Sequence, residues 1–302
     1  MVILAFLVVL GSPKVTAPQP TESRQLSQEK IEPPPPPPPQ LPFGGRQLIP
    51  NFRFVAVYGS PNYPGLGVLG HQPLNETLTR VKALANSYQP FSTQTVIPTL
   101  EIIASVASVG PTENGDYSQE VDINSLMPWI VAAKDQKMYI VLDLQPGRVS
   151  FLDQARHYES LLLYEHVGLA LDPEWRLQPN QVHLKQIGQV GAVEVNMVSL
   201  WLSEFVKKHN LPQKLFILHQ FRQDMLPDRE QIITSYPELS YVFHIDGQGS
   251  QPAKDDTYRN LTIVPPPNAY FGWKNFYQKD IGLRSPEATM AVQPTPWFIT
   301  YQ

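Results

Sequence analysis

The chain has 302 residues, of which 42% are apolar and 17% are charged, so it can bury a sizeable core in one large domain or two small ones. Its formal net charge of −4 provides no overall electrostatic attraction to nucleic acid or to an anionic membrane. The absence of cysteine excludes disulfides, thiolate metal sites, a cysteine nucleophile and a lipidated N-terminal cysteine.

The N-terminal segment has the pattern of a secretion signal. Residues 2–10 form one apolar run that is too short for an ordinary transmembrane helix. Val15-Thr16-Ala17 then matches a signal-peptidase cleavage site, although no basic residue precedes the apolar run. We therefore expect residues 1–17 to be a signal peptide, with a buried N-terminal strand as the alternative. Left uncleaved, this segment would be the only contact with a membrane.

Residues 18–43 are expected to form a proline-rich linker. They include seven consecutive prolines, Pro33–Pro39, and many Ser, Gln, Glu and Thr residues. Consecutive prolines cannot join a helix or a central strand, and they adopt the stiff polyproline II conformation. A signal followed by a stiff stalk predicts a secreted or cell-envelope-associated bacterial protein, with a folded domain at residues 44–302.

The rest of the chain alternates between strand-like and helix-like segments. Most of the strand-like segments are continuous apolar runs, which is typical of parallel strands buried on both faces. The eight candidate strands are Arg53–Gly59, Thr95–Ala104, Met138–Leu144, Gly168–Glu174, Lys214–Gln220, Tyr241–Gln248, Ala269–Phe276 and Trp297–Gln302. Amphipathic helices are expected near residues 78–88, 126–133, 152–162 and 198–206, and short ones at 228–236, 253–258 and 286–292.

Eight such units in about 250 residues predict a single-domain α/β fold, the (β/α)8 TIM barrel. An open doubly wound sheet is the alternative. The glycine-rich phosphate-binding sequence of that fold does not follow the first strand, which favours the barrel.

The active site of such a barrel lies at the C-terminal ends of its strands. Polar residues stand at the end of nearly all of the eight apolar runs. Exposure to solvent alone does not explain why they occupy the same relative position in separate strands. They are Tyr58, Asp143, Gln145, Asp172, Glu174, His219, Gln220, His244, Asp246, Gln248, Lys274 and Tyr301, with Glu101 ambiguous because its strand contains Pro98. The sequence therefore predicts one polar site at this end of the barrel.

The most distinctive local sequence is Asp172-Pro173-Glu174-Trp175. On a strand, carboxylates at i and i+2 point to the same side, and two acids in one cleft push their pKa values apart. Glycoside hydrolysis needs one protonated acid and one carboxylate, and an aromatic ring can stack on a sugar. We expect Glu174 to be the general acid, with Asp172 or Asp143 as nucleophile or electrostatic partner. Alternatively, Asp172 caps the next loop and Glu174 forms a surface ion pair.

The other polar residues at the strand ends are expected to contact substrate. They are Tyr58, Trp175, His219, Gln220, Asp246, Lys274 and Tyr301. Lys274 is expected to pair with the acids rather than to form a Schiff base. We expect no metal and no cofactor, but His219, His244 and Asp246 could instead ligate a divalent metal.

At Asp172-Pro173-Glu174 the chain resembles the barrel-type glycosidases whose acids lie at the end of the fourth strand. It is similar to the D-x-E muramidases and, more loosely, to the chitinase-like barrels, over this triplet and the strand order. Tyr58 stands where the muramidases have an Asp, and the chitinase sequence D-x-x-D-x-D-x-E is absent. The chain also resembles uncharacterised exported cell-envelope proteins of bacteria.

Together these features predict a secreted glycoside-hydrolase-like enzyme that acts as a monomer on a polysaccharide or cell-wall glycan. Its aromatic-rich loops contain few charges and favour a neutral polymer. Nucleic acid is not an expected partner. The two alternatives are a metal-dependent hydrolase and a non-catalytic barrel that binds glycan or cell wall.

Overall fold

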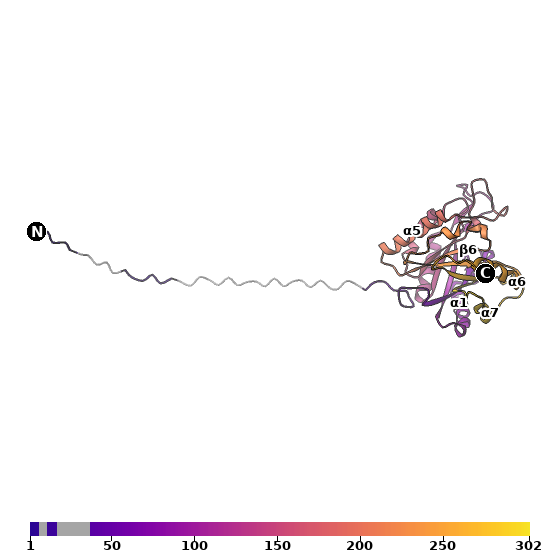
Figure 1. Ribbon diagram of the computed structural model, residues 1–302, viewed down its shortest axis with the longest axis horizontal. Coiled ribbons are helices and arrows are strands. Elements are labelled where there is room, and N and C mark those ends of the chain that lie inside the picture. Colours follow the sequence, from indigo (N-terminus) through magenta and orange to yellow (C-terminus); the bar gives the residue numbers. More distant parts are fainter. Residues whose placement is uncertain (6–10, 17–36) are drawn as a thin grey trace. The chain divides into compact units, whose positions relative to one another are not determined.

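The computed structural model describes residues 1–5, 11–16 and 37–302 of the chain. Most of the expected leader and linker therefore lies outside the described residues. Residues 1–5 and 11–16 belong to no helix or strand. Residues 38–302 form a compact unit that contains every element named below (Figure 1). None of the described helices has the length and apolar character needed to cross a membrane.

Eight parallel strands close into a barrel. They are β1 (Phe52–Gly59), β2 (Thr95–Ala107), β4 (Tyr139–Leu144), β5 (Val167–Leu171), β6 (Lys214–Gln220), β7 (Leu239–Ile245), β8 (Tyr270–Asn275) and β9 (Phe298–Tyr301). Each strand pairs with the next one of this series, and β1 pairs with both β2 and β9, which closes the circle. The predicted single-domain (β/α)8 barrel is confirmed.

Helices cover the outside of the barrel. They are α1 (Leu74–Tyr88), α2 (Ile123–Asp135), α3 (Phe151–His157), α4 (Glu159–Leu162), α5 (Ala192–Lys208), α6 (Gln251–Thr262) and α7 (Pro286–Met290). Their apolar residues, such as Val81, Leu126 and Leu202, pack against outward side chains of the strands in the main core. Near the end of the chain, α7 packs beside α1 (Figure 1).

The connection between β6 and β7 differs from the expected pattern. Residues 228–236 were expected to form a short helix, but only a single 3₁₀ turn is present, at Arg229–Gln231. These three residues are polar, so a longer helix here would have no apolar face to bury against the barrel. Arg229 instead donates hydrogen bonds to the carbonyl oxygens of Leu261, at 2.7 Å, and Val264, at 3.0 Å.

Strand β2 extends beyond the rim of the barrel. A bulge between Ile103 and Ser105 shifts its register with β4, and its last residues pair antiparallel with the short strand β3 (Ser118–Glu120). Gln154 of α3 ties this hairpin down, because it accepts a hydrogen bond from Ser105 Oγ at 2.6 Å and donates one to Ser118 Oγ at 2.8 Å. The hairpin forms one wall of the rim.

The helix expected after β4 is divided into α3 and α4 at Tyr158. The Tyr158 hydroxyl donates to the carbonyl oxygen of Val121 at 3.1 Å and also contacts the carbonyl oxygen of Ala104. These bonds anchor the helical layer to the base of the β2–β3 hairpin.

The N-terminal end of the barrel is filled by apolar side chains. Phe54, Tyr139 and Phe298 belong to one buried cluster there. Leu41, which is only 3% exposed, is part of this cluster, and Phe43 packs against it with its ring 4.8 Å from that of Phe52. The last residues of the expected linker therefore contribute to the folded core.

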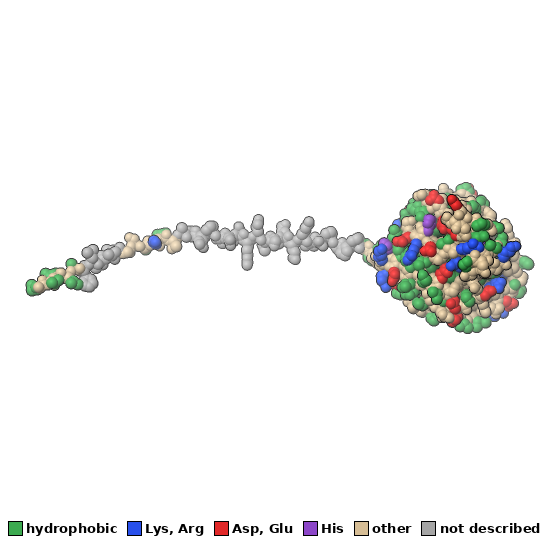
Figure 2. Space-filling model, turned by 90° about the horizontal axis from the view of Figure 1, so that it is seen from above, with side chains coloured by type: hydrophobic (Ala, Val, Ile, Leu, Met, Phe, Trp, Pro, Cys, Tyr) green, Lys and Arg blue, Asp and Glu red, His purple; other side chains and the backbone are tan. Residues whose placement is uncertain are grey.

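Charges of both signs are mixed on the surface of the domain. On the face shown in Figure 2, Lys and Arg side chains are interspersed with Asp and Glu. This mixture agrees with the small net charge of the chain. Attraction of a charged ligand to this protein must therefore come from groups close to its binding site.

Candidate active site

Near the C-terminal end of the barrel, inward-facing side chains change from apolar to polar. Successive residues of a strand point to opposite faces, so only every second residue enters the barrel. In this way β1, β4, β6 and β8 direct Tyr58, Asp143, His219 and Lys274 inward, and Asp246 follows the end of β7. Hydrogen bonds and ion pairs connect these five side chains to one another. The predicted convergence of polar residues from separate strands is therefore present.

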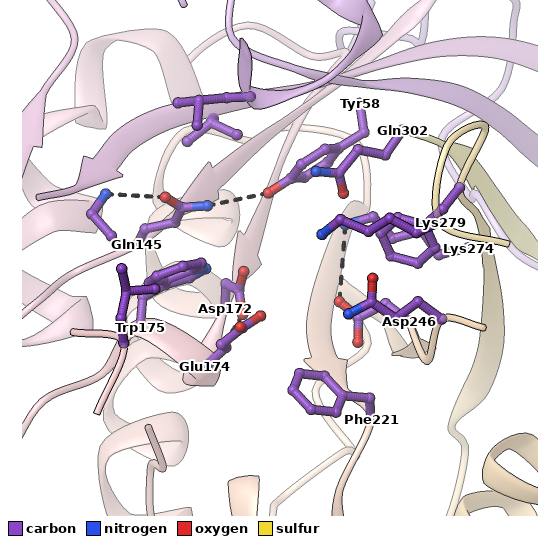
Figure 3. A pocket seen from close by; sticks show the side chains of 16 residues that line it. Tyr58, Gln145, Asp172, Glu174, Trp175, Phe221, Asp246, Lys274, Lys279 and Gln302 are labelled. Carbon is purple, nitrogen blue, oxygen red and sulfur yellow. Dashed lines mark hydrogen bonds and ion pairs between the residues drawn. The ribbon is translucent and has the colours of Figure 1, made fainter. Parts of the chain in front are cut away.

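A pocket of about 320 Å³ opens above these residues (Figure 3). Eight of the expected site residues line it, namely Tyr58, Gln145, Asp172, Glu174, Trp175, Asp246, Gln248 and Lys274. Its walls also include Lys279, Gln302, Phe221 and Phe276, which the sequence did not single out. These four residues follow the ends of their strands, and no regular spacing marks them.

Asp172 and Glu174 lie just beyond a strand rather than on one. The expected strand at residues 168–174 ends at Leu171, and Pro173–Trp175 form a 3₁₀ turn. The Asp172 side chain caps this turn, with Oδ1 accepting a hydrogen bond from the Glu174 N–H at 3.2 Å. The turn presents Glu174 and Trp175 to the pocket (Figure 3). The loop-capping alternative is thus correct for Asp172, but Glu174 is not part of a surface ion pair in the described structure.

The two acids of this turn favour their protonated forms. Burial raises the pKa of Glu174 to about 7, and the negative charge of Asp246 acts in the same direction. Burial also raises the pKa of Asp172 well above its usual range, with the charges of Asp143 and Glu174 adding to the effect and that of His219 opposing it. Asp172 therefore favours its neutral form, and Glu174 titrates close to pH 7.

Asp246 faces this turn from the other side of the pocket and is ionised (Figure 3). Burial alone would raise its pKa, but the hydrogen bond and positive charge of His219, together with the charge of Lys274, hold the pKa below its usual range. His219 Nδ1 lies 3.0 Å from Asp246 Oδ2, and Lys274 Nζ lies 3.9 Å from the same oxygen. The pocket therefore combines a protonated acid on one side with a carboxylate on the other.

His219 lies beneath the pocket and is completely buried. Its Nε2 is 3.0 Å from Glu101 Oε1 and 3.8 Å from Asp143 Oδ1. Burial alone would lower its pKa, but the charges of Glu101 and Asp143 and the hydrogen bonds to Asp246 and Glu101 raise it well above its usual range. His219 therefore favours its imidazolium form, in which it donates one N–H to Asp246 and the other to Glu101. It supports a lining residue and does not itself line the pocket.

Asp143 is also completely buried and lies behind the pocket wall. The Tyr58 hydroxyl donates to its Oδ2 at 2.9 Å, and Gln145 Nε2 donates to the Tyr58 oxygen at 3.3 Å. Burial raises the pKa of Asp143 to about 6, with the charge of Glu101 adding to the effect and those of His219 and Lys274 opposing it. Asp143 can therefore act on a ligand only through Tyr58 or His219.

His244 occupies a different environment from His219. Its Nε2 lies 2.8 Å from Thr300 Oγ1, and burial, together with the charges of His219 and Lys274, lowers its pKa well below its usual range. Gly272 makes room for it, because a Cβ at position 272 would overlap the His244 ring. Within residues 1–5, 11–16 and 37–302, no three His, Asp or Glu side chains are placed to hold a metal ion. His219, His244 and Asp246 therefore do not form a ligand cluster.

Three expected substrate contacts do not line the pocket: His219 lies beneath it, and Gln220 and Tyr301 lie outside it. Gln220 accepts a hydrogen bond from Arg229 at 2.8 Å and lines a separate surface pocket. The Tyr301 hydroxyl lies 2.5 Å from that of Tyr88 on α1. Gln220 and Tyr301 each follow the inward-facing residue of their strand by one position. The inward-facing residues are His219 on β6 and Thr300 on β9. A polar residue at the end of a strand was therefore a poorer predictor of a pocket contact than the alternation of inward-facing and outward-facing residues along that strand.

A scan of protein-family models and a search of curated proteins found no match to this chain. Among solved structures, a new form of a xylanase and amylase inhibitor protein is 13% identical to it, with a TM-score of 0.46 over 82% of this chain and 92% of that one. A xylanase and α-amylase inhibitor protein from Scadoxus multiflorus is 12% identical, with a TM-score of 0.45 and the same coverage. The barrel assignment given above rests on the strand pairing of this chain, independently of both.

Proposed function

We propose that this barrel is an exported glycoside hydrolase that cleaves a polysaccharide or cell-wall glycan. One observation carries the proposal: Glu174, whose pKa is raised to about 7, faces the ionised Asp246 across a pocket that also contains Trp175. Glycoside hydrolysis requires such a pair, because one acid must protonate the leaving oxygen while a carboxylate stabilises the cationic sugar. Trp175 supplies an apolar surface on which a sugar ring can stack.

The proposed reaction assigns each side of the pocket a separate role. Glu174 donates its proton to the glycosidic oxygen as the bond between that oxygen and the anomeric carbon breaks. Asp246 stabilises the positive charge that develops on the anomeric carbon, and water completes the hydrolysis by adding to this carbon and giving its proton to a carboxylate. Asp172 is a positioning residue in this scheme, because it favours its neutral form and its side chain caps the turn that carries Glu174.

Asp246 thus takes the role that the sequence suggested for Asp172 or Asp143. Asp172 favours its neutral form, and Asp143 is enclosed behind the pocket wall. Only an ionised carboxylate that reaches the pocket can stabilise a cationic sugar directly. His219 and Lys274 favour the ionised form of Asp246.

The test is hydrolysis by the full chain of a panel of β-glucans, chitin oligosaccharides and peptidoglycan, with new reducing ends as the measure. Glu174→Gln and Asp246→Asn should each lower the rate by about 10²–10⁴-fold, the usual range for general acid–base catalysis. Glu204→Gln is the matched control, because Glu204 is exposed on α5. The parent rate should fall as the pH rises above about 7, because Glu174 then loses its proton.

The same panel separates the alternative functions. Activity that survives Glu174→Gln but disappears with a chelator would favour a metal-dependent hydrolase and contradict the proposal. Glycan binding without any cleavage by the parent protein would favour a non-catalytic barrel.

A further inference from the structure

A second pocket, of about 230 Å³, adjoins the one described above. The two pockets share Phe276, Lys279 and Gln302. Residues 64–71, which follow β1, form the opposite side of the second pocket. The two pockets therefore lie side by side, so a ligand of several units could reach from the first to the second. A chain of sugar units has this extended form.

An exposed aromatic ring forms part of the second pocket. Tyr277 is 39% exposed and lines the second pocket. The Arg80 guanidinium lies 5.2 Å from the centre of the Tyr277 ring, and the Tyr301 ring lies 5.4 Å from it. These neighbours hold the ring in place while leaving part of it open. A ring held in this way offers a prepared surface for stacking, at little cost in conformational entropy.

One lysine and no acidic residue are among the described residues that line the second pocket. The lysine is Lys279, and His71 also lines this pocket. Lys279 stands at the junction of the two pockets and is exposed, with its ammonium 5.7 Å from the Phe276 ring centre. Figure 3 shows Lys279 close to Gln302 and Lys274 at the edge of the first pocket. Its charge also reaches the opposite wall, because it lowers the pKa of Glu174 against the effect of burial.

We propose that the second pocket is a saccharide subsite for a sugar unit that bears a carboxylate, with Tyr277 against the sugar ring and Lys279 paired with the carboxylate. An ammonium–carboxylate pair is a charge-assisted contact that a neutral sugar cannot make. This inference rests on the proposed function and defines its substrate class as an acidic glycan. It replaces the neutral polymer expected from the low charge of the loops.

The test measures binding rather than cleavage, using the full chain with Glu174→Gln so that the ligand stays intact. The probes are oligosaccharides of polyglucuronate, of polygalacturonate and of the muramic-acid-containing peptidoglycan strand, each compared with its own carboxyl-reduced form. At least one acidic probe should bind about tenfold more tightly than its reduced form, which is a difference of about 1.4 kcal/mol.

Three further variants locate this preference. Lys279→Met should remove the preference, so that the acidic probe binds no more tightly than its reduced form, whereas Tyr277→Ala should weaken the binding of both forms. Lys208→Met is the matched control, because Lys208 is exposed at the end of α5. Equal binding of both forms, a preference that survives Lys279→Met, or no binding of any acidic probe would overturn the inference.

Failure of this inference is distinguishable from failure of the proposed function. Selective binding of an acidic probe that the parent protein never cleaves would support the subsite and contradict the hydrolase. Cleavage of neutral and acidic glycans at equal rates, with equal binding, would support the hydrolase and contradict the subsite.

Discussion

Replacing Glu174 with glutamine should change how the stability of this protein depends on pH. In the folded protein the pKa of Glu174 is about 7, against an ordinary value of 4.5. Between these two pH values the folded state retains a proton that the unfolded state has released. Stability therefore falls as the pH rises through this window. Glutamine keeps the size of the side chain but does not titrate, so the variant escapes this loss.

The magnitude follows from the size of the pKa change. At about 1.4 kcal/mol per pKa unit, a shift from 4.5 to about 7 corresponds to about 3 kcal/mol of unfolding free energy. Glu174 retains some contact with solvent, which screens the effect and reduces our expectation to about 2 kcal/mol. Loss of its charge also relieves Asp172, whose pKa it helps to raise, and this acts in the same direction.

The assay is urea-induced unfolding of the parent protein and of Glu174→Gln at several pH values from 4.5 to 8. Other titrating groups are present in both proteins, so most of their contribution cancels in the difference. The variant should gain about 2 kcal/mol relative to the parent over this range. Glu204→Gln should show no such trend. A difference between the parent and Glu174→Gln that does not change with pH would refute the raised pKa, and with it the acid role.

Three further predictions concern other parts of the barrel. His219→Gln should cost about 3–5 kcal/mol of unfolding free energy in urea titrations, because it leaves the buried Glu101 and Asp246 without their shared cation; a cost below about 1 kcal/mol would contradict a buried imidazolium. Gly272→Ala should lower the thermal midpoint by several degrees, because its Cβ overlaps His244, whereas Gly110→Ala, which has open space around it, should leave the midpoint unchanged. Leu41→Ala should cost about 2–5 kcal/mol of unfolding free energy in urea titrations, because Leu41 is buried in the apolar cluster at the N-terminal end of the barrel. A chain shortened to begin at residue 38 should be as stable as the full chain. A loss of stability in the shortened chain would show that earlier residues also contribute.

The barrel could be predicted from the sequence because its eight strands are continuous apolar runs separated by helical patterns. The position of the pocket could be predicted as well, since the strands of a barrel all end at the same rim. Glu174, Trp175 and Asp246 were found in this way, and all three line the pocket. The roles of the acids could not be predicted, because they depend on which carboxylate both reaches the pocket and is stabilised in its ionised form by His219 and Lys274.

Glu101 shows why part of the site was not recognised. It was ambiguous in the sequence because its strand contains Pro98, yet β2 runs through Pro98 and continues beyond Glu101 to Ala107. Its inward position follows from pairing with Tyr58 of β1, which no local pattern reveals. Lys279 was missed for a different reason. It lies in a loop, where the geometry follows from tertiary contacts rather than from a repeating pattern.

The hydrogen-bonded hairpin of β2 and β3 makes its side of the first pocket more rigid than the other walls. Gln154 and Tyr158 fix the base of the hairpin, and Gln145 Oε1 accepts a hydrogen bond from the Ala107 N–H at 3.0 Å at the pocket wall. A ligand that contacts the hairpin binds to side chains that are already ordered, so the protein loses little conformational entropy there. Leu184, which is 70% exposed, and Lys279 on other walls have more freedom to lose. Differences in affinity among ligands should therefore arise mainly from those walls, where substitutions can retune selectivity without disturbing the barrel.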